Sequence, residues 1–239
     1  MIRSQFYKIL ISTILRIYPS LILADQIGYS GTDSSGIYLD QKLIKKMNYR
    51  NGVFIEVGAY DGITQSNTML LEELYGWTGI LIEPSEVLFP ILSSNRPNSR
   101  CYQCALGSFQ EDNTYVYGDF NGTPMSSVGG KRLNNSANIR VFVRSLQSIL
   151  DEACLQHINF FSLDTEGYEL NILKGIDFNR TVFDYMLIEI YTDQYNDIIA
   201  FLESKGYDLV ENVTNFNRAV NPDYDGTHND YLFKRADLK

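Results

Sequence analysis

Cysteine is scarce in this chain, which has three such residues, Cys101, Cys104 and Cys154, among 239. A small, odd number of cysteines argues against a disulfide framework and for a reducing compartment, so we expect a cytoplasmic location. Cys101 and Cys104 have the C-x-x-C spacing of zinc or redox sites, but no second pair completes four zinc ligands. Because both fall in a predicted strand, where positions three apart point to opposite faces, we expect buried structural thiols.

Clusters of basic residues are also missing. The chain has 20 lysines and arginines against 29 acidic residues, a net charge of −9, and no basic run longer than Lys45-Lys46. Proteins that bind nucleic acid usually carry a basic stripe that contacts the phosphate backbone. The composition therefore argues against a nucleic-acid partner and favours a small-molecule or glycan substrate.

No hydrophobic run is long enough to span a membrane. Between Met1 and Ala24, the apolar stretch Ile9–Leu15 is interrupted by Arg16, well short of the ~18 apolar residues that a spanning helix needs. We expect an amphipathic helix that packs on the domain or contacts a membrane surface or a partner; a signal peptide is the alternative. Residues 1–36 are thus predicted to be an extension of one helix and a loop.

From residue 37 to residue 239, apolar strand patterns alternate with helical patterns, which predicts a single α/β domain with a mainly parallel sheet. The predicted strands are Val53–Val57, Gly79–Glu83, Arg100–Cys104, Ile158–Asp164, Tyr185–Tyr191, Tyr207–Val213 and Asp230–Lys234. The predicted helices are Tyr38–Met47, Gln65–Tyr75, Ser85–Ser93, Leu146–Cys154, Tyr168–Lys174 and Gln194–Lys205.

Two segments break this alternation. Near residues 108–144 we expect an inserted hairpin, formed by Tyr115–Tyr117 and Arg140–Val143. The connection Thr214–Thr227 leaves no room for a crossover helix, and parallel strands need roughly a dozen connecting residues. The last strand is therefore predicted to run antiparallel to its neighbours.

A glycine turn follows the first predicted strand. The run Phe54-Ile55-Glu56-Val57 leads into Gly58-Ala59-Tyr60-Asp61-Gly62. Glycine at such a turn lets the backbone approach a ligand closely, next to a helix N-terminus. The dinucleotide fingerprint G-x-G-x-x-G is absent, so the turn suits the amino-acid end of a smaller nucleoside ligand, whose ammonium would contact Glu56 or Asp61.

An acidic residue ends the second predicted strand, in Ile80-Leu81-Ile82-Glu83-Pro84. A carboxylate at this place accepts both hydroxyls of a ribose through one bidentate contact. A role at the start of the helix that Ser85 opens is the alternative. The neighbouring turn at Gly58 favours the ribose role.

The segment Phe160–Glu169 brings further carboxylates to the same sheet edge. Ligands of open α/β sheets bind at the carboxyl ends of the strands, so Asp164 is expected to face the same crevice as Glu56 and Glu83. Helix N-capping is the alternative role for Asp164 or Glu166. Glu169 is expected to interact mainly with the first helical turn.

The segment Phe54–Pro84, which contains Ser66-Asn67-Thr68 and Gly76-Trp77-Thr78-Gly79, and the segment Ser162–Glu169 together resemble the FkbM-type family of S-adenosylmethionine-dependent methyltransferases. The likeness extends from about Gln41 to Tyr191. It implies a Rossmann-like class I methyltransferase fold, with helices on both faces of a seven-stranded sheet whose last strand is antiparallel. It also implies S-adenosylmethionine as the cofactor and O-methylation of a hydroxyl on a sugar, glycan or related small molecule.

From the residues and the resemblance together we predict the site. The cofactor-binding residues are predicted to be Glu56, Gly58, Ala59, Tyr60, Asp61, Gly62, Asn67, Glu83, Pro84, Ala105 and Asp164. The catalytic residues are predicted to be Asp164, Glu166 and His228. His228 begins the antiparallel last strand and so lies at the active edge, whereas His157 precedes its strand and is expected to be structural.

No metal site is predicted, because the strand ends offer Asp164 and Glu189 but no adjacent acid pair near Tyr191. Two other functions stay open. One is a non-catalytic nucleoside-binding or interaction domain, and the other is an NAD-dependent enzyme acting on nucleotide sugars. The intact acids argue against the first, and the absent glycine fingerprint argues against the second.

Overall fold

The computed structural model describes residues 28–222 and 224–238. The helix predicted within residues 1–24, and with it the predicted contact with a membrane or partner, lies outside the described residues. Within 28–222 and 224–238, no helix has both the length and the apolar character needed to cross a bilayer.

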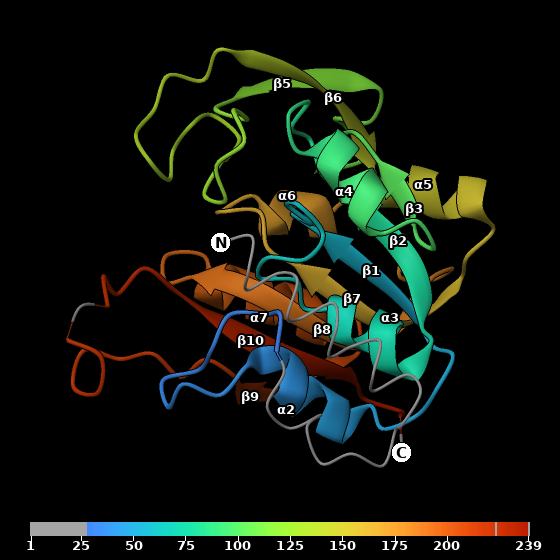
Figure 1. Cartoon of the computed structure of the whole chain (residues 1–239), viewed down its shortest axis with the longest axis vertical. Helices are drawn as coiled ribbons and strands as arrows, with labels where there is room; N and C mark the ends of the chain where they lie inside the picture. The colour runs from blue at the N-terminus through green and yellow to red at the C-terminus, as the bar shows by residue number, and fades with distance from the viewer. Residues whose placement is uncertain (1–27, 223, 239) are drawn as a thin grey trace.

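The centre of the protein is a seven-stranded sheet with the strand order β3-β2-β1-β7-β8-β10-β9 (Figure 1). Its strands are β1 (Val53–Val57), β2 (Thr78–Ile82), β3 (Arg100–Tyr102), β7 (His157–Leu163), β8 (Val182–Tyr191), β9 (Tyr207–Asn212) and β10 (His228–Arg235). β10 pairs antiparallel with both β8 and β9, whereas the pairs among β3, β2, β1, β7 and β8 are parallel. The prediction of a mostly parallel sheet with an antiparallel last strand is therefore confirmed.

Helices cover both faces of this sheet because successive strand residues point to opposite sides. Ile55 and Phe161 join a core cluster on one face that also contains apolar residues of α5 (Leu146–Ala153), α6 (Glu169–Leu173) and α7 (Tyr195–Ser204). Phe54 and Phe160 join a second cluster with residues of α2 (Leu39–Lys46), α3 (Met69–Tyr75) and α4 (Phe89–Asn95). The result is a three-layer arrangement with the core on each side of the sheet.

A second, three-stranded sheet lies beside the first. β5 (Thr114–Gly118) pairs antiparallel with β6 (Ile139–Ser145), and β4 (Ala105–Gly107) pairs parallel with β6. The predicted strand Arg100–Cys104 is wrong in its extent. β3 ends at Tyr102, because the chain leaves the main sheet there to pair with β6.

The start of α3 differs from the prediction as well. Helical spacing predicted a helix from Gln65, but α3 begins at Met69. Gln65 has a φ of +61°, and the hydroxyls of Ser66 and Thr68 donate hydrogen bonds to the Glu56 carboxylate. This tertiary contact keeps residues 65–68 out of the helix. Similarly, α4 begins at Phe89 rather than at Ser85.

Candidate active site

A pocket opens at the carboxyl ends of β1, β2 and β7, the edge where parallel α/β sheets bind ligands. The space within it, including open solvent at the mouth, is about 840 Å³. The turn after β1 forms its floor, and residues near Glu83 and Asp164 form two of its walls. Phe120, Thr123 and Ser126, from the connection between β5 and β6, close it from above.

Gly58 allows two strand ends to come together. Its φ is +79°, and a Cβ at this position would lie 1.9 Å from the backbone oxygen of Asp164. No side chain fits there, so β1 and β7 can approach closely only with glycine at this position. The backbone of Gly58, Ala59 and Tyr60 therefore lines the pocket directly.

The carboxylate of Glu56 is fully engaged by the loop that precedes α3. Its Oε1 accepts from the Asn67 backbone N–H at 2.7 Å, and its Oε2 accepts from the Ser66 and Thr68 hydroxyls at 2.8 and 2.6 Å. The guanidinium of Arg96, 0% exposed, lies 3.8 Å away. Burial raises the pKa of Glu56, and Arg96 opposes that rise. Glu56 thus lines the pocket but organises the loop, and its predicted contact with an ammonium stays a prediction.

Glu83 at the end of β2 has hydrogen-bonding capacity left over. Its Oε2 accepts from the Tyr60 N–H at 3.0 Å and its Oε1 from the Ser85 N–H at 2.9 Å. An ionised carboxylate has about four acceptor positions, so roughly half of them remain. Burial raises the pKa of Glu83 to about 7, although these two hydrogen bonds act to lower it. The side chain can therefore receive donors from a ligand.

The structure brings most of the predicted cofactor residues to this pocket. The lining includes Glu56, Gly58, Ala59, Tyr60, Glu83, Pro84, Ala105, Asp164 and Glu166.

Three of the predicted cofactor-binding residues are not among the described residues that line it, and each has another role. Asp61 accepts hydrogen bonds from the backbone of Ile63 and Thr64 and so closes the turn. At Gly62 an added Cβ would meet the side chain of Arg96. Asn67 donates to the hydroxyl of Ser162.

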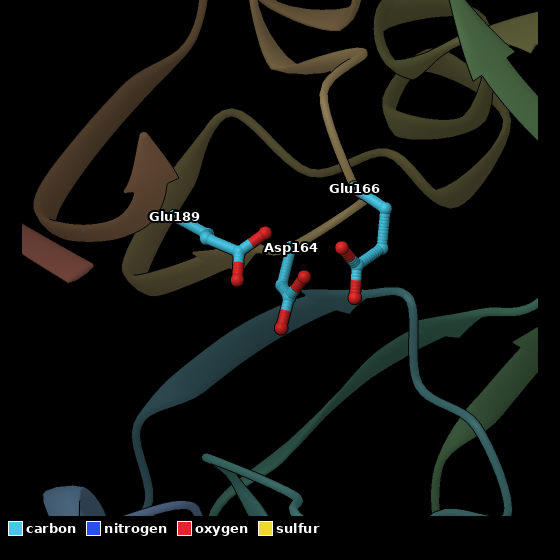
Figure 2. Close-up of side chains that lie close together, drawn as sticks. All are labelled: Asp164, Glu166 and Glu189. Carbon is cyan, nitrogen blue, oxygen red and sulfur yellow. The ribbon is translucent and has the colours of Figure 1, made fainter. Parts of the chain in front are cut away.

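Three carboxylates meet near the carboxyl ends of β7 and β8, as Figure 2 shows: Asp164 and Glu166 follow β7, and Glu189 lies within β8. Asp164, Glu166 and Glu189 each place one oxygen within 4.8 Å of the others. Burial raises the pKa of Asp164 well above its usual range, and the neighbouring carboxylates raise it further. The same two causes raise the pKa of Glu189. Asp230, directly opposite Glu189 in the β8–β10 pair, adds a fourth acid whose pKa burial raises to about 6.

Glu166 reaches the cluster through an unusual backbone conformation. Its φ is +58°, followed by Gly167 at +100°. Such left-handed conformations are uncommon for a residue with a side chain and tend to occur at functional sites. Tyr191 donates its hydroxyl to Glu166 Oε2, and Arg132 Nε lies 3.2 Å from the same oxygen.

His228 lies at the border of the acid cluster, and Glu189 links it to the other acids. Its Nε2 is 3.2 Å from Glu189 Oε1, and its Nδ1 is 2.7 Å from the Thr227 hydroxyl. His228 lines a smaller surface hollow with Phe216 and Tyr224, not the main pocket. His157, in contrast, begins β7 at the opposite end and contacts Asp184 at 2.9 Å.

Sequence reasoning missed Arg132. It lies in the connection between β5 and β6 and pairs with Glu166 at 3.2 Å and with Asp225 at 3.1 Å. Burial acts to lower the pKa of Arg132, but the neighbouring acids outweigh it and raise the pKa. An isolated arginine in a polar loop carries no local pattern, so only the tertiary contact reveals it.

The cysteines lie as free thiols on different sides of the sheet. Cys104 is buried in the cluster with α5, whereas Cys101 packs against the cluster with α2. Burial raises the pKa of Cys104 to about 12, which keeps this thiol protonated and unreactive.

The sequence and the fold were compared with those of known proteins. No curated protein matches the sequence. A solved methyltransferase FkbM from Methylobacillus flagellatus KT shares 15% identity, with 93% of this chain and 60% of that chain covered and a TM-score of 0.44. A TehB-like S-adenosylmethionine-dependent methyltransferase from Corynebacterium glutamicum has 11% identity, 83% and 88% coverage and a TM-score of 0.46. Fibrillarin from Aeropyrum pernix, with bound S-adenosylmethionine, has 11% identity, 77% and 67% coverage and a TM-score of 0.47.

A family model gives the decisive comparison. The model of the methyltransferase FkbM domain matches residues 56–209. This range begins at the Glu56 carboxylate of β1 and extends through Glu83, Asp164 and Glu189 into β9. Since the match spans more than half of the chain and the sheet has the predicted class I topology, this chain belongs to the FkbM methyltransferase family.

Proposed function

We propose that this chain is an S-adenosylmethionine-dependent O-methyltransferase that acts on a hydroxyl of a sugar, a glycan or a related small molecule. The observation that carries the proposal is that one pocket contains both Glu83, a carboxylate with unused hydrogen-bond acceptor positions, and the acids Asp164 and Glu166. A site that both holds a nucleoside and activates a hydroxyl needs these two parts side by side.

The residues of the pocket fit the cofactor. Glu83 retains acceptor positions for two ribose hydroxyls. The backbone at Gly58–Tyr60 leaves room for the amino-acid end. Ala105 and Phe120, both about 5% exposed, give the pocket an apolar wall suited to a purine ring.

When bound, the cofactor supplies a methyl group that is activated by its sulfonium. The chain must then align the acceptor oxygen and exclude water. Asp164 is the residue that would hold the acceptor hydroxyl and take its proton, because its raised pKa brings it nearer to the operating pH of a general base. Glu166, held by Tyr191 and Arg132, would position the acceptor.

The acceptor class rests on the polar groups around the mouth. Thr123 and Ser126 line the pocket, and the connection Thr214–Thr227 borders the hollow beside His228. Hydroxyl and carboxylate groups suit a polyhydroxylated acceptor, and the net charge of −9 disfavours nucleic acid. Three free thiols support a reducing, cytoplasmic setting.

Calorimetry with S-adenosylmethionine, S-adenosylhomocysteine and NAD tests cofactor choice. We expect both sulfur nucleosides to bind, NAD not to bind, and Glu83→Ala to weaken binding of both. Binding of NAD alone would favour the nucleotide-sugar enzyme. Absence of sulfur-nucleoside binding, with no effect of Glu83→Ala, would overturn the proposal.

Transfer itself is tested with methyl-labelled cofactor and a panel of glycans and free sugars. We expect label in an acceptor, and loss of at least about 100-fold in rate for Asp164→Asn, the usual contribution of a general base. The matched control is Glu203→Gln, a change at an exposed carboxylate of α7. Binding without transfer to any acceptor would favour the non-catalytic domain. Near-normal transfer in Asp164→Asn would exclude Asp164 as the base.

A further inference from the structure

The acid cluster at the ends of β7 and β8 has more negative charge than its neighbours balance. Asp164, Glu166, Glu189 and Asp230 act on one another electrostatically. The guanidinium that pairs with this group is that of Arg132, which is shared with Asp225. Gathering carboxylates in a partly buried site without a matching cation is costly. Such an arrangement favours a bound positive ion.

Glu189 gives a second observation that points into the cluster. Its side chain is 7% exposed, and its Oε2 has no hydrogen-bond partner among the described residues. Its other oxygen, Oε1, contacts His228. In Figure 2 the Glu189 carboxylate points toward Asp164 and Glu166. When all three groups are ionised, a buried carboxylate oxygen that is aimed at two further carboxylates finds no donor there, so only a shared proton or a cation can be its partner.

The contacts of Glu166 and His228 agree with this picture. Arg132 and Tyr191 both use Oε2 of Glu166, so Oε1 is available to the cluster. The Thr227 hydroxyl donates its one proton to Asp225 at 2.6 Å, so the 2.7 Å contact with His228 assigns the ring proton to Nδ1. In the neutral ring, Nε2 then turns a lone pair toward Glu189 Oε1. A neutral ring therefore gives no proton to Glu189 and leaves the negative charge of that carboxylate unbalanced.

We propose that Asp164, Glu166 and Glu189 bind one divalent cation of the oxygen-preferring class, Mg²⁺ or Mn²⁺. Mg²⁺–oxygen bonds of about 2.0–2.1 Å place ligand oxygens at most about 4.2 Å apart. The three oxygens lie within 4.8 Å of one another, so small side-chain rotations bring them to that separation. Carboxylate ligands select this class over zinc or copper. The sequence predicts no metal, because Asp164 and Glu189 have no adjacent acid pair near Tyr191; in the structure Glu166 supplies the third carboxylate.

The position of the ion suggests a role in methyl transfer. That role rests on the proposed function, whereas binding of the ion does not. Asp164 and Glu166 also line the cofactor pocket. A cation held by both would bind the acceptor hydroxyl and lower the pKa of that hydroxyl. The proton would pass to the Asp164 oxygen that does not hold the ion. The acceptor oxygen would then form a bond to the methyl carbon as the carbon–sulfur bond breaks, and S-adenosylhomocysteine would leave.

Binding is tested on the full chain with Mn²⁺ alone, by the loss of the electron paramagnetic resonance signal of the free ion. We expect one Mn²⁺ per chain, displaced by Mg²⁺, and a drop in affinity of at least about tenfold in Glu189→Gln, as for loss of a group at a metal site. Asp164→Asn is the second variant, in case the first does not fold. Glu203→Gln, in α7, is the control and should bind Mn²⁺ like the unmodified chain.

The same samples receive S-adenosylmethionine without metal, so that the two proposals fail separately. Cofactor binding without Mn²⁺ binding would overturn the ion site and leave the methyltransferase proposal standing. Mn²⁺ binding that Glu189→Gln and Asp164→Asn both leave unchanged would place the ion elsewhere and also overturn it. Mn²⁺ binding that both variants weaken, in a chain that binds no cofactor, would support the ion site and contradict the proposed function.

Discussion

Glu83 and Arg96 show what single side chains do in this fold. Each is buried, and each holds backbone around the glycine turn after β1. Glu83 accepts from the Tyr60 N–H, while Arg96 donates to the Gly62 carbonyl at 2.9 Å. Both side chains therefore fix the shape of the pocket floor.

The pH dependence of cofactor binding tests Glu83. Its pKa of about 7 in the free protein lies above the usual value because of burial. Ribose hydroxyls that donate to the carboxylate favour its charged form, so binding should release a proton and affinity should rise as the pH increases through about 7. Calorimetry in buffers of different ionisation enthalpy measures the released proton.

Glu83→Gln provides the comparison. The glutamine amide is neutral and has one acceptor oxygen, so it cannot accept hydrogen bonds from both ribose hydroxyls as a carboxylate does. We therefore expect the affinity for the cofactor at pH 8 to fall about tenfold or more, the usual contribution of a charge-assisted hydrogen bond. The affinity rise and proton release through pH 7 should also disappear. If the variant kept the same pH profile as the unmodified chain, Glu83 would not be the titrating contact.

Replacing Arg96 tests the buried ion network. Its Nε donates to Glu72 Oε2 at 2.8 Å, and its Nη2 donates to the Thr68 hydroxyl at 3.1 Å. Arg96→Met leaves the carboxylates of Glu72 and Glu56 buried without this cation. We expect the free energy of unfolding to fall by about 3–5 kcal/mol, the usual cost of breaking a buried pair, measured by urea denaturation.

Arg100→Met is the matched control, because Arg100 is exposed at the start of β3. Its effect should stay within about 0.5 kcal/mol, as is usual for surface substitutions. Equal losses in the two variants would show that the Arg96 network contributes nothing specific.

At the scale of elements, the decisive feature is the junction of β1, its turn and β7. The register pairs Val57 with Leu163, and the Asp164 N–H donates to the Val57 carbonyl at 3.3 Å. Gly58 then lies directly against the Asp164 backbone. This contact sets how far apart the cofactor turn and the Asp164 carboxylate can be.

Gly58→Ala should therefore disturb fold and site together. The new Cβ would meet a backbone carbonyl, which cannot rotate away as a side chain could. We expect a loss of about 1–3 kcal/mol from crowding, beyond the cost of a positive φ, together with weaker cofactor binding. Denaturant unfolding and calorimetry measure the two effects.

Gly36→Ala separates crowding from backbone strain. Gly36 has nearly the same φ, +80°, but an added Cβ there would meet nothing within 4 Å. We expect only the left-handed penalty of about 1–2 kcal/mol and unchanged cofactor affinity. A loss in Gly36→Ala as large as that in Gly58→Ala would contradict the crowding argument.

At the scale of the whole molecule, Arg132 joins three distant parts of the chain. It lies in the β5–β6 connection, pairs with Glu166 after β7 and with Asp225 before β10, and its guanidinium is 5.9 Å from the Tyr191 ring. These contacts hold the roof of the pocket against the strand ends. The turn after β1 supplies the floor, and the connection between β5 and β6 supplies the roof. In Figure 1, β5 and β6 lie above the main sheet.

Arg132→Ala should loosen this roof without unfolding the core. We expect faster amide hydrogen exchange in residues 119–138, 214–222 and 224–227, and no change in β1 or β7, because local opening depends on such contacts. Arg140→Ala is the control, since Arg140 stacks on Tyr115 at 3.7 Å instead of reaching Glu166. If both variants exchanged alike, the link through Arg132 would not hold the roof.

The sequence by itself determined the layered α/β fold, the antiparallel last strand and the strand-end acids Glu56, Glu83 and Asp164. These follow from patterns that the chain carries locally: apolar runs, connection lengths and the position of an acid after a strand. Burial of both sheet faces requires continuous apolar strands, so Phe54-Ile55 and Phe160-Phe161 are visible in the sequence before any contact is known.

Only the tertiary structure decided how these groups are used. The bonds from Ser66 and Thr68 to Glu56 shorten α3, and the pairing of Ala105–Gly107 with β6 ends β3 early. Glu166 lies near Glu189, although the two come from different segments of the chain. Glu166 also pairs with Arg132, and Glu189 with His228. Such contacts depend on how the layers pack and on the left-handed conformation of Glu166. No local sequence pattern predicts either of these.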